Sequence, residues 1–340
     1  MAFDSELMKL LQEDFKDNIK VTRVSEDMRG KIIIIYGDND TGKTSQASKF
    51  SDSVLYLPLA EGLNAVNGAM AITITSWGDL TRYSKKLTTK QYKDYLKNKE
   101  AVLCIDELEK IGSYAKEYLQ NKYGVADIGK ANNGFGAWGE YESIVWSWFK
   151  SLTSIGWTII GLGHPSYDKD TDFYDLQGDW RATKPIKDAA DLVVYLQPNG
   201  TDSNGIPIPS TAYLRRTDFC FARCRFDKIV PCLEEFTAQG LREVFVQAIR
   251  EKNKEDGVDN ATFEEQFSVS DKKEIPFEEI VEGIKKYAKE LESQGKIDIF
   301  YDILDQHLGE DNTFPNCSPR QKDNLLSVYY ELKETLGITE

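Results

Sequence analysis

The sequence predicts an α/β fold with a mostly parallel sheet, followed by a small helical C-terminal domain. Short apolar runs alternate with amphipathic stretches from residue 31 onward. The first run, KIIIIY at residues 31–36, has the β-branched composition of a strand that is buried on both faces. After Pro231 the pattern changes to helical periodicity alone. Strands that alternate with helices imply a parallel sheet covered on both sides.

The elements follow in order from these patterns. We expect strands at residues 31–36, 53–59, near 71–75, and at 101–105, 157–162, 191–196 and 212–216. Helices are expected from Lys43, at 78–87 and around 142–152. Residues 197–210 are rich in Gly, Pro, Asn and Ser and predict an exposed turn or hairpin tip. The C-terminal helices are predicted at 233–250, 277–293, 297–308 and 318–336.

Three segments result from this pattern. Residues 1–24 form an N-terminal helical segment, 25–235 the α/β core, and 236–340 an acidic helical C-terminal domain. In the first segment, Leu7, Met8, Leu11 and Phe15 lie roughly on one helical face. That face would pack on a neighbouring subunit or on the chain's own core.

Composition and charge narrow the classes of function. No apolar run approaches the roughly 18 residues of a membrane span, so we expect a cytoplasmic protein with no membrane partner. The five cysteines show no metal-binding spacing, and we expect them to be reduced. The net charge of −14 argues against a nucleic-acid partner, but most of the acidic excess follows Glu251.

One motif predicts the chemistry. Residues 37–44 fit the pattern G-x-x-x-x-G-K-[ST] between a predicted strand and a predicted helix. Backbone N–H groups of such a loop hold phosphates, Lys43 reaches the outer phosphates, and the Thr44 hydroxyl binds Mg²⁺. The sequence therefore predicts an ATP site with bound Mg²⁺. Its residues are Gly37, Asp38, Asn39, Asp40, Thr41, Gly42, Lys43, Thr44 and Ser45.

A second motif, AVLCIDE at residues 101–107, has the form of a Walker B strand. Asp106 at its end is the expected ligand of Mg²⁺, acting through water. Hydrolysis also needs a carboxylate that orients or deprotonates the attacking water. Two candidates remain open at this point, Glu107 directly after the strand and Glu61 beyond the strand VLYLPLA.

His164 ends the predicted strand WTIIGLG, at the sheet edge where ligands bind in open α/β folds. It is a candidate sensor of the γ-phosphate. The alternative is a loop histidine that makes ordinary hydrogen bonds.

The ordered segments GDNDTGKTS, LPLAEGLNAV, TSWGDL, AVLCIDE, TIIGLGHPS, PIKDAADLVVYL and LRRTDFCFARCRF add a resemblance. Over residues 25–235 the chain resembles phage-encoded RecA-like nucleotide-binding proteins, including single-strand-annealing recombinase ATPases. The resemblance implies a RecA-like P-loop NTPase core that assembles as a homo-oligomer with ATP at subunit interfaces. It favours Glu61 as the catalytic base and His164 as the sensor. It also implies that Arg223 and Arg225 reach the neighbouring subunit's ATP.

The resemblance further implies single-stranded DNA as a partner, and with it annealing or strand exchange. The DNA-binding loop would cover residues 165–187. Within it, Tyr167 and Trp180 would stack on bases, and Arg181, Lys184 and Lys187 would contact phosphates. Residues 111–141 would form a second DNA-facing or interface loop, or an ordered insertion.

Two other functions stay open. Glu107 directly follows Asp106, which is not the RecA pattern, so an AAA+ or RecA-type motor such as a helicase loader or packaging ATPase remains an alternative. A nucleotide-switched protein-interaction module is the third. The acidic C-terminal domain would dock a single-stranded-DNA-binding or replication protein, or simply solubilise the chain. If the protein is phage-encoded, its compartment is the host cytoplasm.

Overall fold

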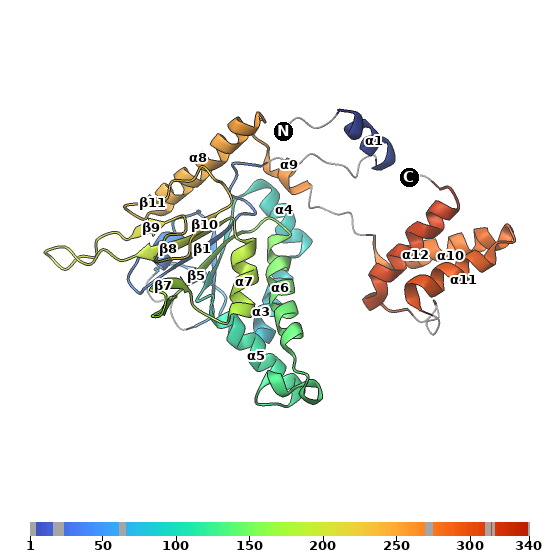
Figure 1. Ribbon diagram of the computed structural model, residues 1–340, viewed down its shortest axis with the longest axis horizontal. Helices are drawn as coiled ribbons and strands as arrows, with labels where there is room; N and C mark the ends of the chain where they lie inside the picture. Colours follow the sequence, from blue (N-terminus) through green and yellow to red (C-terminus); the bar gives the residue numbers. More distant parts are fainter. Residues whose placement is uncertain are drawn as a thin grey trace. The chain divides into compact units, whose positions relative to one another are not determined.

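The computed structural model describes residues 5–15, 24–60, 66–268, 275–309, 314 and 317–338. The chain divides into two compact units, Met1–Asp271 and Lys272–Glu340 (Figure 1). The first contains the α/β core, and the second is helical. In the part of the chain that is described, no helix is long and apolar enough to cross a membrane.

A mixed sheet forms the centre of the first unit. Within the described residues it has nine strands, in the order β11-β9-β8-β1-β5-β4-β2-β3, with β10 beside β8. Strands β1, β2, β3, β4, β5 and β8 are parallel, whereas β9, β10 and β11 pair antiparallel. The strands are β1 (Ile32–Gly37), β2 (Val54–Pro58), β3 (Met70–Ala71), β4 (Val102–Asp106), β5 (Thr158–Gly163), β8 (Leu192–Gln197), β9 (Thr211–Tyr213), β10 (Arg223–Cys224) and β11 (Cys232–Leu233).

Strand β1 shows why the sheet is buried on both faces. Its side chains alternate between two apolar clusters: Ile32, Ile34 and Tyr36 belong to one, and Ile33 and Ile35 to the other. Each cluster is covered by helices, so a continuous β-branched run is stable only in the middle of the unit. The predicted mostly parallel α/β fold is confirmed.

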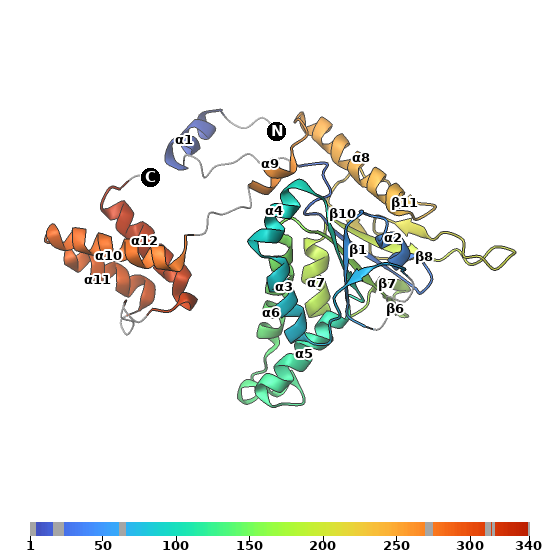
Figure 2. The same cartoon turned by 180° about the vertical axis from the view of Figure 1, so that it is seen from behind.

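Helices cover the sheet on its two sides. One face packs against α3, α5, α6 and α7, and the other against α2 and α8 (Figures 1 and 2). Helix α4 follows α3 and contributes Leu96 to the first of these layers. The helices are α2 (Lys43–Ala47), α3 (Trp77–Leu87), α4 (Lys90–Asn98), α5 (Lys110–Tyr123), α6 (Trp138–Thr153), α7 (Trp180–Ala189) and α8 (Ala238–Asp256). Helix α1 (Ser5–Phe15) lies in the N-terminal segment, as expected.

Two predicted loops are instead regular structure. Residues 165–187 form a hairpin of β6 (Pro165–Asp168) and β7 (Phe173–Leu176) and then most of α7. The hairpin forms because β6 and β7 pair with each other, in register from Pro165↔Leu176 to Asp168↔Phe173. Residues 111–141 lie mostly in α5, two 3₁₀ turns (Ile128–Lys130 and Asn132–Gly134) and the start of α6, as the ordered-insertion alternative required.

The unit boundary differs from the expected one at residue 235. Helix α8 belongs to the core, because its side chains Leu241, Phe245 and Ile249 are fully buried against the sheet. It also begins later than predicted, since the Thr237 side chain accepts a hydrogen bond from the Gly240 amide and caps it. The compact unit therefore continues to Asp271.

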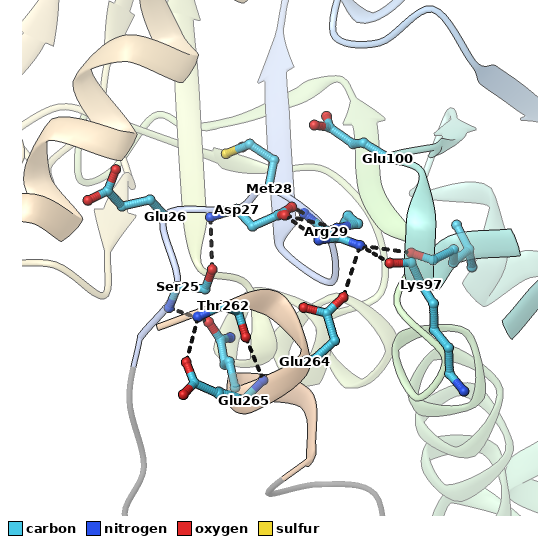
Figure 3. A network of polar contacts seen from close by, with 12 residues as sticks. Ser25, Glu26, Asp27, Met28, Arg29, Lys97, Glu100, Thr262, Glu264 and Glu265 are labelled. Carbon is cyan, nitrogen blue, oxygen red and sulfur yellow. Dashed lines mark hydrogen bonds and ion pairs between the residues drawn. The ribbon is translucent and has the colours of Figure 1, made fainter. Parts of the chain in front are cut away.

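A polar network ties the end of this unit to its beginning (Figure 3). The Ser25 amide and the Lys31 ammonium both donate to the side chain of Gln266, at 2.7 and 3.0 Å. Arg29 contacts Glu264 at 3.5 Å and stacks over the Phe263 ring. Short helix α9 (Phe263–Ser268) carries these partners. Hydrogen bonds between segments more than 200 residues apart explain why residues 236–271 fold with the core rather than with the C-terminal helices.

Within its described residues, the second unit is a cluster of three helices with its own apolar core. Its helices are α10 (Phe277–Ser293), α11 (Ile297–Leu308) and α12 (Lys322–Thr335), with a 3₁₀ turn at Pro319–Gln321. Ile280, Ile284, Leu325, Val328 and Leu332 are fully buried between them. The predicted helical C-terminal part is confirmed, and its first two helices have the predicted bounds.

Candidate nucleotide-binding site

The P-loop lies at the carboxyl edge of the parallel strands. It follows β1, whose last residue Gly37 pairs with Leu196 of β8, and it leads into α2. Gly42 has φ 85° and Asp40 has φ 61°, so the turn uses the left-handed region twice within three residues. The Thr41 hydroxyl donates to the Asp38 carbonyl at 2.7 Å and closes the turn. The predicted strand–turn–helix context of the motif is confirmed.

Gly37 is required by space. A Cβ atom at this position would lie 2.7 Å from the Leu196 carbonyl oxygen and 2.8 Å from the Leu196 Cβ. The neighbouring strand therefore approaches the start of the loop more closely than any side chain would allow.

Lys43 is the buried cation of this loop. Its Nζ donates to the carbonyl oxygens of Gly37 and Asp38, at 2.6 and 2.7 Å, and only 8% of the residue is exposed. Burial lowers the pKa of Lys43, and the charges of Asp106 and Glu109 oppose that lowering. An ammonium held at the centre of a backbone turn has the position and charge to bind phosphate oxygens.

Asp106 ends β4 at the same edge. Burial raises its pKa, the Glu107 charge adds to this, and the Glu107 amide, which donates to Asp106 Oδ1 at 3.1 Å, opposes it together with Lys43 and His164. Glu107 itself has φ 60°, an uncommon conformation for a residue other than glycine. The Asp106 carboxylate is an oxygen ligand of the kind that Mg²⁺ prefers, and the nearby Lys43 ammonium suits phosphate oxygens.

The predicted base Glu61 lies outside the described residues. The strand before it, β2, pairs with β4 up to Pro58↔Asp106, and the Leu59 amide donates to the Asp106 carbonyl at 3.1 Å. Residues just before the undescribed segment 61–65 therefore lie beside Asp106, at the carboxyl edge of the sheet.

His164 contacts the P-loop. Its Nε2 lies 3.1 Å from Asn39 Oδ1, and its Nδ1 lies 2.6 Å from Glu109 Oε1. The first contact brings together two residues that the sequence proposed separately. The second involves Glu109, which the sequence analysis missed. Acidic residues are common at helix starts, so only the contact with His164 distinguishes Glu109.

A polar cavity of about 410 Å³ lies next to these residues. Its wall includes Glu107, Glu109, His164, Lys116 and Gln177. Glu109 Oε2 is buried and has no hydrogen-bond partner among the described residues.

Arg223 and Arg225 lie at the other edge of the sheet. Arg223 lies in β10, which pairs antiparallel with β8 near the start of β8. It donates to the carbonyls of Lys187 and Asp188. Arg225 is 3.3 Å from Asp191 and donates to the Ala189 carbonyl at 2.6 Å. The structure thus places neither arginine beside the P-loop of its own chain.

The cations proposed for DNA are paired with acids of the same region. Lys187 binds Asp175 at 2.7 Å, Lys184 binds Asp188 at 2.6 Å, and Arg181 lies 3.3 Å from Glu142. The aromatic candidates differ, since Trp180 is 60% exposed and Tyr167 45%. The structure therefore leaves stacking surface available but little unpaired positive charge on this segment.

Two comparisons with known proteins agree with this geometry. Residues 29–226 match the family model described as "AAA domain". The chain is also 34% identical, over 320 residues, to the SPbeta prophage-derived uncharacterized protein YorG of Bacillus subtilis (strain 168). That similarity covers 94% of this chain and 98% of the relative. The matched region begins before the P-loop and ends just after Arg225, so it contains the whole described site. This chain therefore belongs to the AAA-domain family.

Proposed function

We propose that this protein hydrolyses ATP at the P-loop and couples hydrolysis to single-stranded DNA in recombination, by annealing or strand exchange. The observation that carries the enzymatic part is the convergence of Lys43, Asp106 and His164 on one sheet edge. Lys43 is buried in the P-loop turn, and His164 touches the same turn through Asn39. The family match to an AAA domain supports nucleotide binding.

The residues divide the work as follows. The backbone of residues 37–45 and Lys43 bind the phosphates. Thr44 and Asp106 would hold Mg²⁺, which neutralises charge on the phosphate oxygens when bound. A water molecule then attacks the γ-phosphorus, the bond to the bridging oxygen breaks, and ADP and phosphate leave.

The base is either Glu61 or Glu107. Glu61 follows the strand that pairs with Asp106, and the resemblance to RecA-like proteins favours it. Glu107 lies directly beside Asp106 and lines the polar cavity. The left-handed backbone of Glu107 supports this alternative, because strained residues gather at functional sites.

Single-stranded DNA is the proposed partner of residues 165–187, the segment that carries Trp180 and Tyr167. Their exposure supports base stacking. Because the nearby cations are already paired, we expect modest affinity that falls with salt. The prophage origin of the relative supports a phage origin for this chain, and with it a role in phage DNA metabolism in the host cytoplasm.

Assembly is the second part of the proposal. We propose a homo-oligomer in which Arg223 and Arg225 act on a neighbour's nucleotide. Their place at the sheet edge opposite the P-loop is compatible with head-to-tail stacking of copies. R225A should lower ATP hydrolysis, and mixing it with K43A protein should restore part of the activity, because each supplies what the other lacks. No restoration by mixing would contradict action across an interface.

A nucleotide-switched interaction module is the second candidate. The observation that favours it is the separate C-terminal unit, which has its own apolar core. In this alternative the unit docks a single-stranded-DNA-binding or replication protein, and nucleotide binding changes its affinity.

The deciding experiment is ATP hydrolysis with and without single-stranded DNA, at low and moderate salt, with K43A as the blank. Stimulation that fades with salt supports the recombination function. Hydrolysis without stimulation favours a partner-gated ATPase, and no activity above the K43A blank would overturn the enzyme. If the wild-type protein hydrolyses ATP, the variants E61Q and E107Q identify the catalytic base. Only the variant that removes the base should lose about 10²–10⁴-fold in kcat.

A further inference from the structure

We propose that Glu109 is a positioning residue of the nucleotide site, which holds His164 against the P-loop so that the imidazole can read the γ-phosphate. This inference rests on the proposed function, since it assumes that the P-loop binds ATP. It adds a residue that neither the motifs nor the family match assigns.

Glu109, His164 and Asn39 form a chain of contacts. Glu109 Oε1 lies 2.6 Å from His164 Nδ1, and His164 Nε2 lies 3.1 Å from Asn39 Oδ1. Glu109 stands immediately before α5, and His164 immediately after β5. The carboxylate therefore joins a helix start to a loop of the site through one imidazole ring.

The second argument is the proton on Nδ1. When Glu109 is a carboxylate its oxygens can only accept, so this contact requires a proton on Nδ1. The Nε2 atom faces Asn39. If Asn39 presents its oxygen, Nε2 is protonated as well; if the amide is flipped, Nε2 accepts from it. In both cases Glu109 fixes the ring orientation and the role of Nδ1, as a carboxylate does for many functional histidines.

The third argument is the tight enclosure of the carboxylate. A Cβ atom at Gly163 would lie 3.2 Å from Glu109 Oε2, and one at Gly178 would lie 3.2 Å from Glu109 Cβ. Gly178 also has φ 124°, a conformation that other residues rarely adopt. The Gln177 amide donates to the His164 carbonyl at 2.9 Å and fixes the backbone of the histidine. Two glycines thus allow close packing around an acid that has little freedom to turn.

The fourth argument is the cost of this arrangement. The Glu109 side chain is only 7% exposed, and its Oε2 atom has no hydrogen-bond partner in the described part of the chain. A buried carboxylate oxygen without a partner lowers stability. A protein keeps such a group where function requires it, and here the satisfied oxygen is the one that holds His164.

The test measures discrimination between ATPγS and ADP as the ratio of their dissociation constants, together with kcat. We expect H164A to reduce this ratio about tenfold, the loss typical of a charge-assisted hydrogen bond. E109A should reduce it by a similar factor, and the double variant E109A/H164A should lose no more than either single variant. E109Q keeps an acceptor oxygen and should lose less than E109A. If E109A fails to fold, E109Q carries the comparison, because it preserves volume.

A matched control is E100Q, in which a partly buried glutamate paired with Arg242 away from the site is changed in the same way. It should leave the ratio unchanged.

The outcomes separate the two proposals. If wild-type protein shows no ATPγS binding that depends on Lys43, the proposed function fails. If binding depends on Lys43 but E109A leaves the ratio intact, the positioning role is overturned. Additive losses from E109A and H164A would overturn it too, because Glu109 would then act by another route.

Discussion

The two edges of the central sheet differ in how completely their buried polar groups are paired. At the amino edge, Asp191 accepts from the Ile32 amide at 2.9 Å and lies 3.3 Å from Arg225, while Lys31 donates to Gln266. Figure 3 shows the adjoining network, in which Arg29 joins Asp27 and Glu264. These polar groups find partners within the protein.

At the carboxyl edge the buried groups are less completely paired. Lys43 donates to backbone carbonyls, and Glu109 has a buried oxygen without a partner among the described residues. Burial raises the pKa of Asp106 here, as it raises that of Asp191 at the amino edge. Asp40 and Glu107 adopt left-handed backbone conformations. The amino edge therefore contributes stability, whereas the carboxyl edge keeps an unpaired buried oxygen and left-handed backbone next to the proposed nucleotide site.

The contrast between the two edges would fail if the Asp106 carboxylate stabilised the free protein. We expect D106N to lose about 10²–10³-fold in kcat, because the site loses the charge that holds Mg²⁺. The free protein should instead gain about 1 kcal/mol, or roughly 2–4 °C in Tm, at pH 7. The measurements are steady-state ATP hydrolysis and thermal unfolding without nucleotide.

The sign of that gain follows from the pKa of Asp106. A folded-state pKa above the unfolded value of about 3.9 means that the folded state holds the proton more tightly, so stability falls as pH rises through this range. Asn carries no charge and avoids this loss. The gain should disappear below about pH 4. D188N, which removes one partner of an exposed pair, is the control and should change little.

The amino edge should show the reverse behaviour. D191A leaves the Ile32 amide without its acceptor and Arg225 without its carboxylate partner, so we expect a loss of about 3 kcal/mol in the free energy of unfolding. Nucleotide affinity of the folded fraction should stay unchanged. Urea unfolding and ATPγS binding at low temperature measure the two effects.

D191N retains an acceptor oxygen for Ile32 and is the matched variant. Burial raises the pKa of Asp191 despite its neighbours, so removal of the charge alone should cost less than removal of the side chain. Equal losses from D191A and D191N would show that the charge of Asp191, rather than its hydrogen bond with the Ile32 amide, accounts for the lost stability.

The tight start of the P-loop gives a smaller effect. G37A places a Cβ atom 2.7 Å from the Leu196 carbonyl oxygen, which is backbone and cannot move aside. We expect a loss of about 1–3 kcal/mol in stability, together with weaker nucleotide binding. G139A in α6 is the control, because nothing lies within 4 Å of the added Cβ. It should raise stability by about 0.5–1 kcal/mol. The measurement is thermal unfolding of G37A and G139A beside the wild type.

The smallest effect tests a single pair of the amino network. Burial alone would raise the pKa of Asp27, but its hydrogen bonds with Arg29 hold that pKa below its usual value. A lowered pKa contributes stability above the unfolded pKa, and this contribution is lost as pH falls below about 4. D27N should cost about 1 kcal/mol at pH 7 and less at pH 3.5.

Chemical unfolding at the two pH values measures the difference between D27N and wild type. D94N, which breaks an exposed contact of 3.7 Å with Lys97, should cost less at both values. A constant difference for D27N across this range would mean that packing, rather than charge, explains its effect.

Much of the fold follows from local pattern. The run of isoleucines in β1 requires burial on both sides, and the P-loop glycines and Lys43 are recognisable at fixed spacing, so the strand, the turn and the helix start were predictable. The C-terminal helices Phe277–Ser293 and Ile297–Leu308 were equally clear, because their apolar spacing is regular.

The rest depended on contacts between distant segments. The segment of β6, its turn and β7 carries aspartates at 168, 170, 172 and 175 and resembles a loop until the pairing of its strands is seen. The unit boundary at Asp271 depends on Gln266 and Glu264, which contact residues more than 230 positions earlier. No local pattern reports such contacts.

The sequence by itself determined the α/β class, the P-loop and the acid at the end of the Walker B strand, because each depends on residue type at short, fixed spacing. Only the tertiary structure decided that His164 meets Asn39, that Glu109 lies behind it, and that Arg223 and Arg225 lie at the far edge. The physical reason is the order of strands: β5 brings residue 164 beside the P-loop, and the antiparallel pairing of β10 carries the arginines to the start of β8.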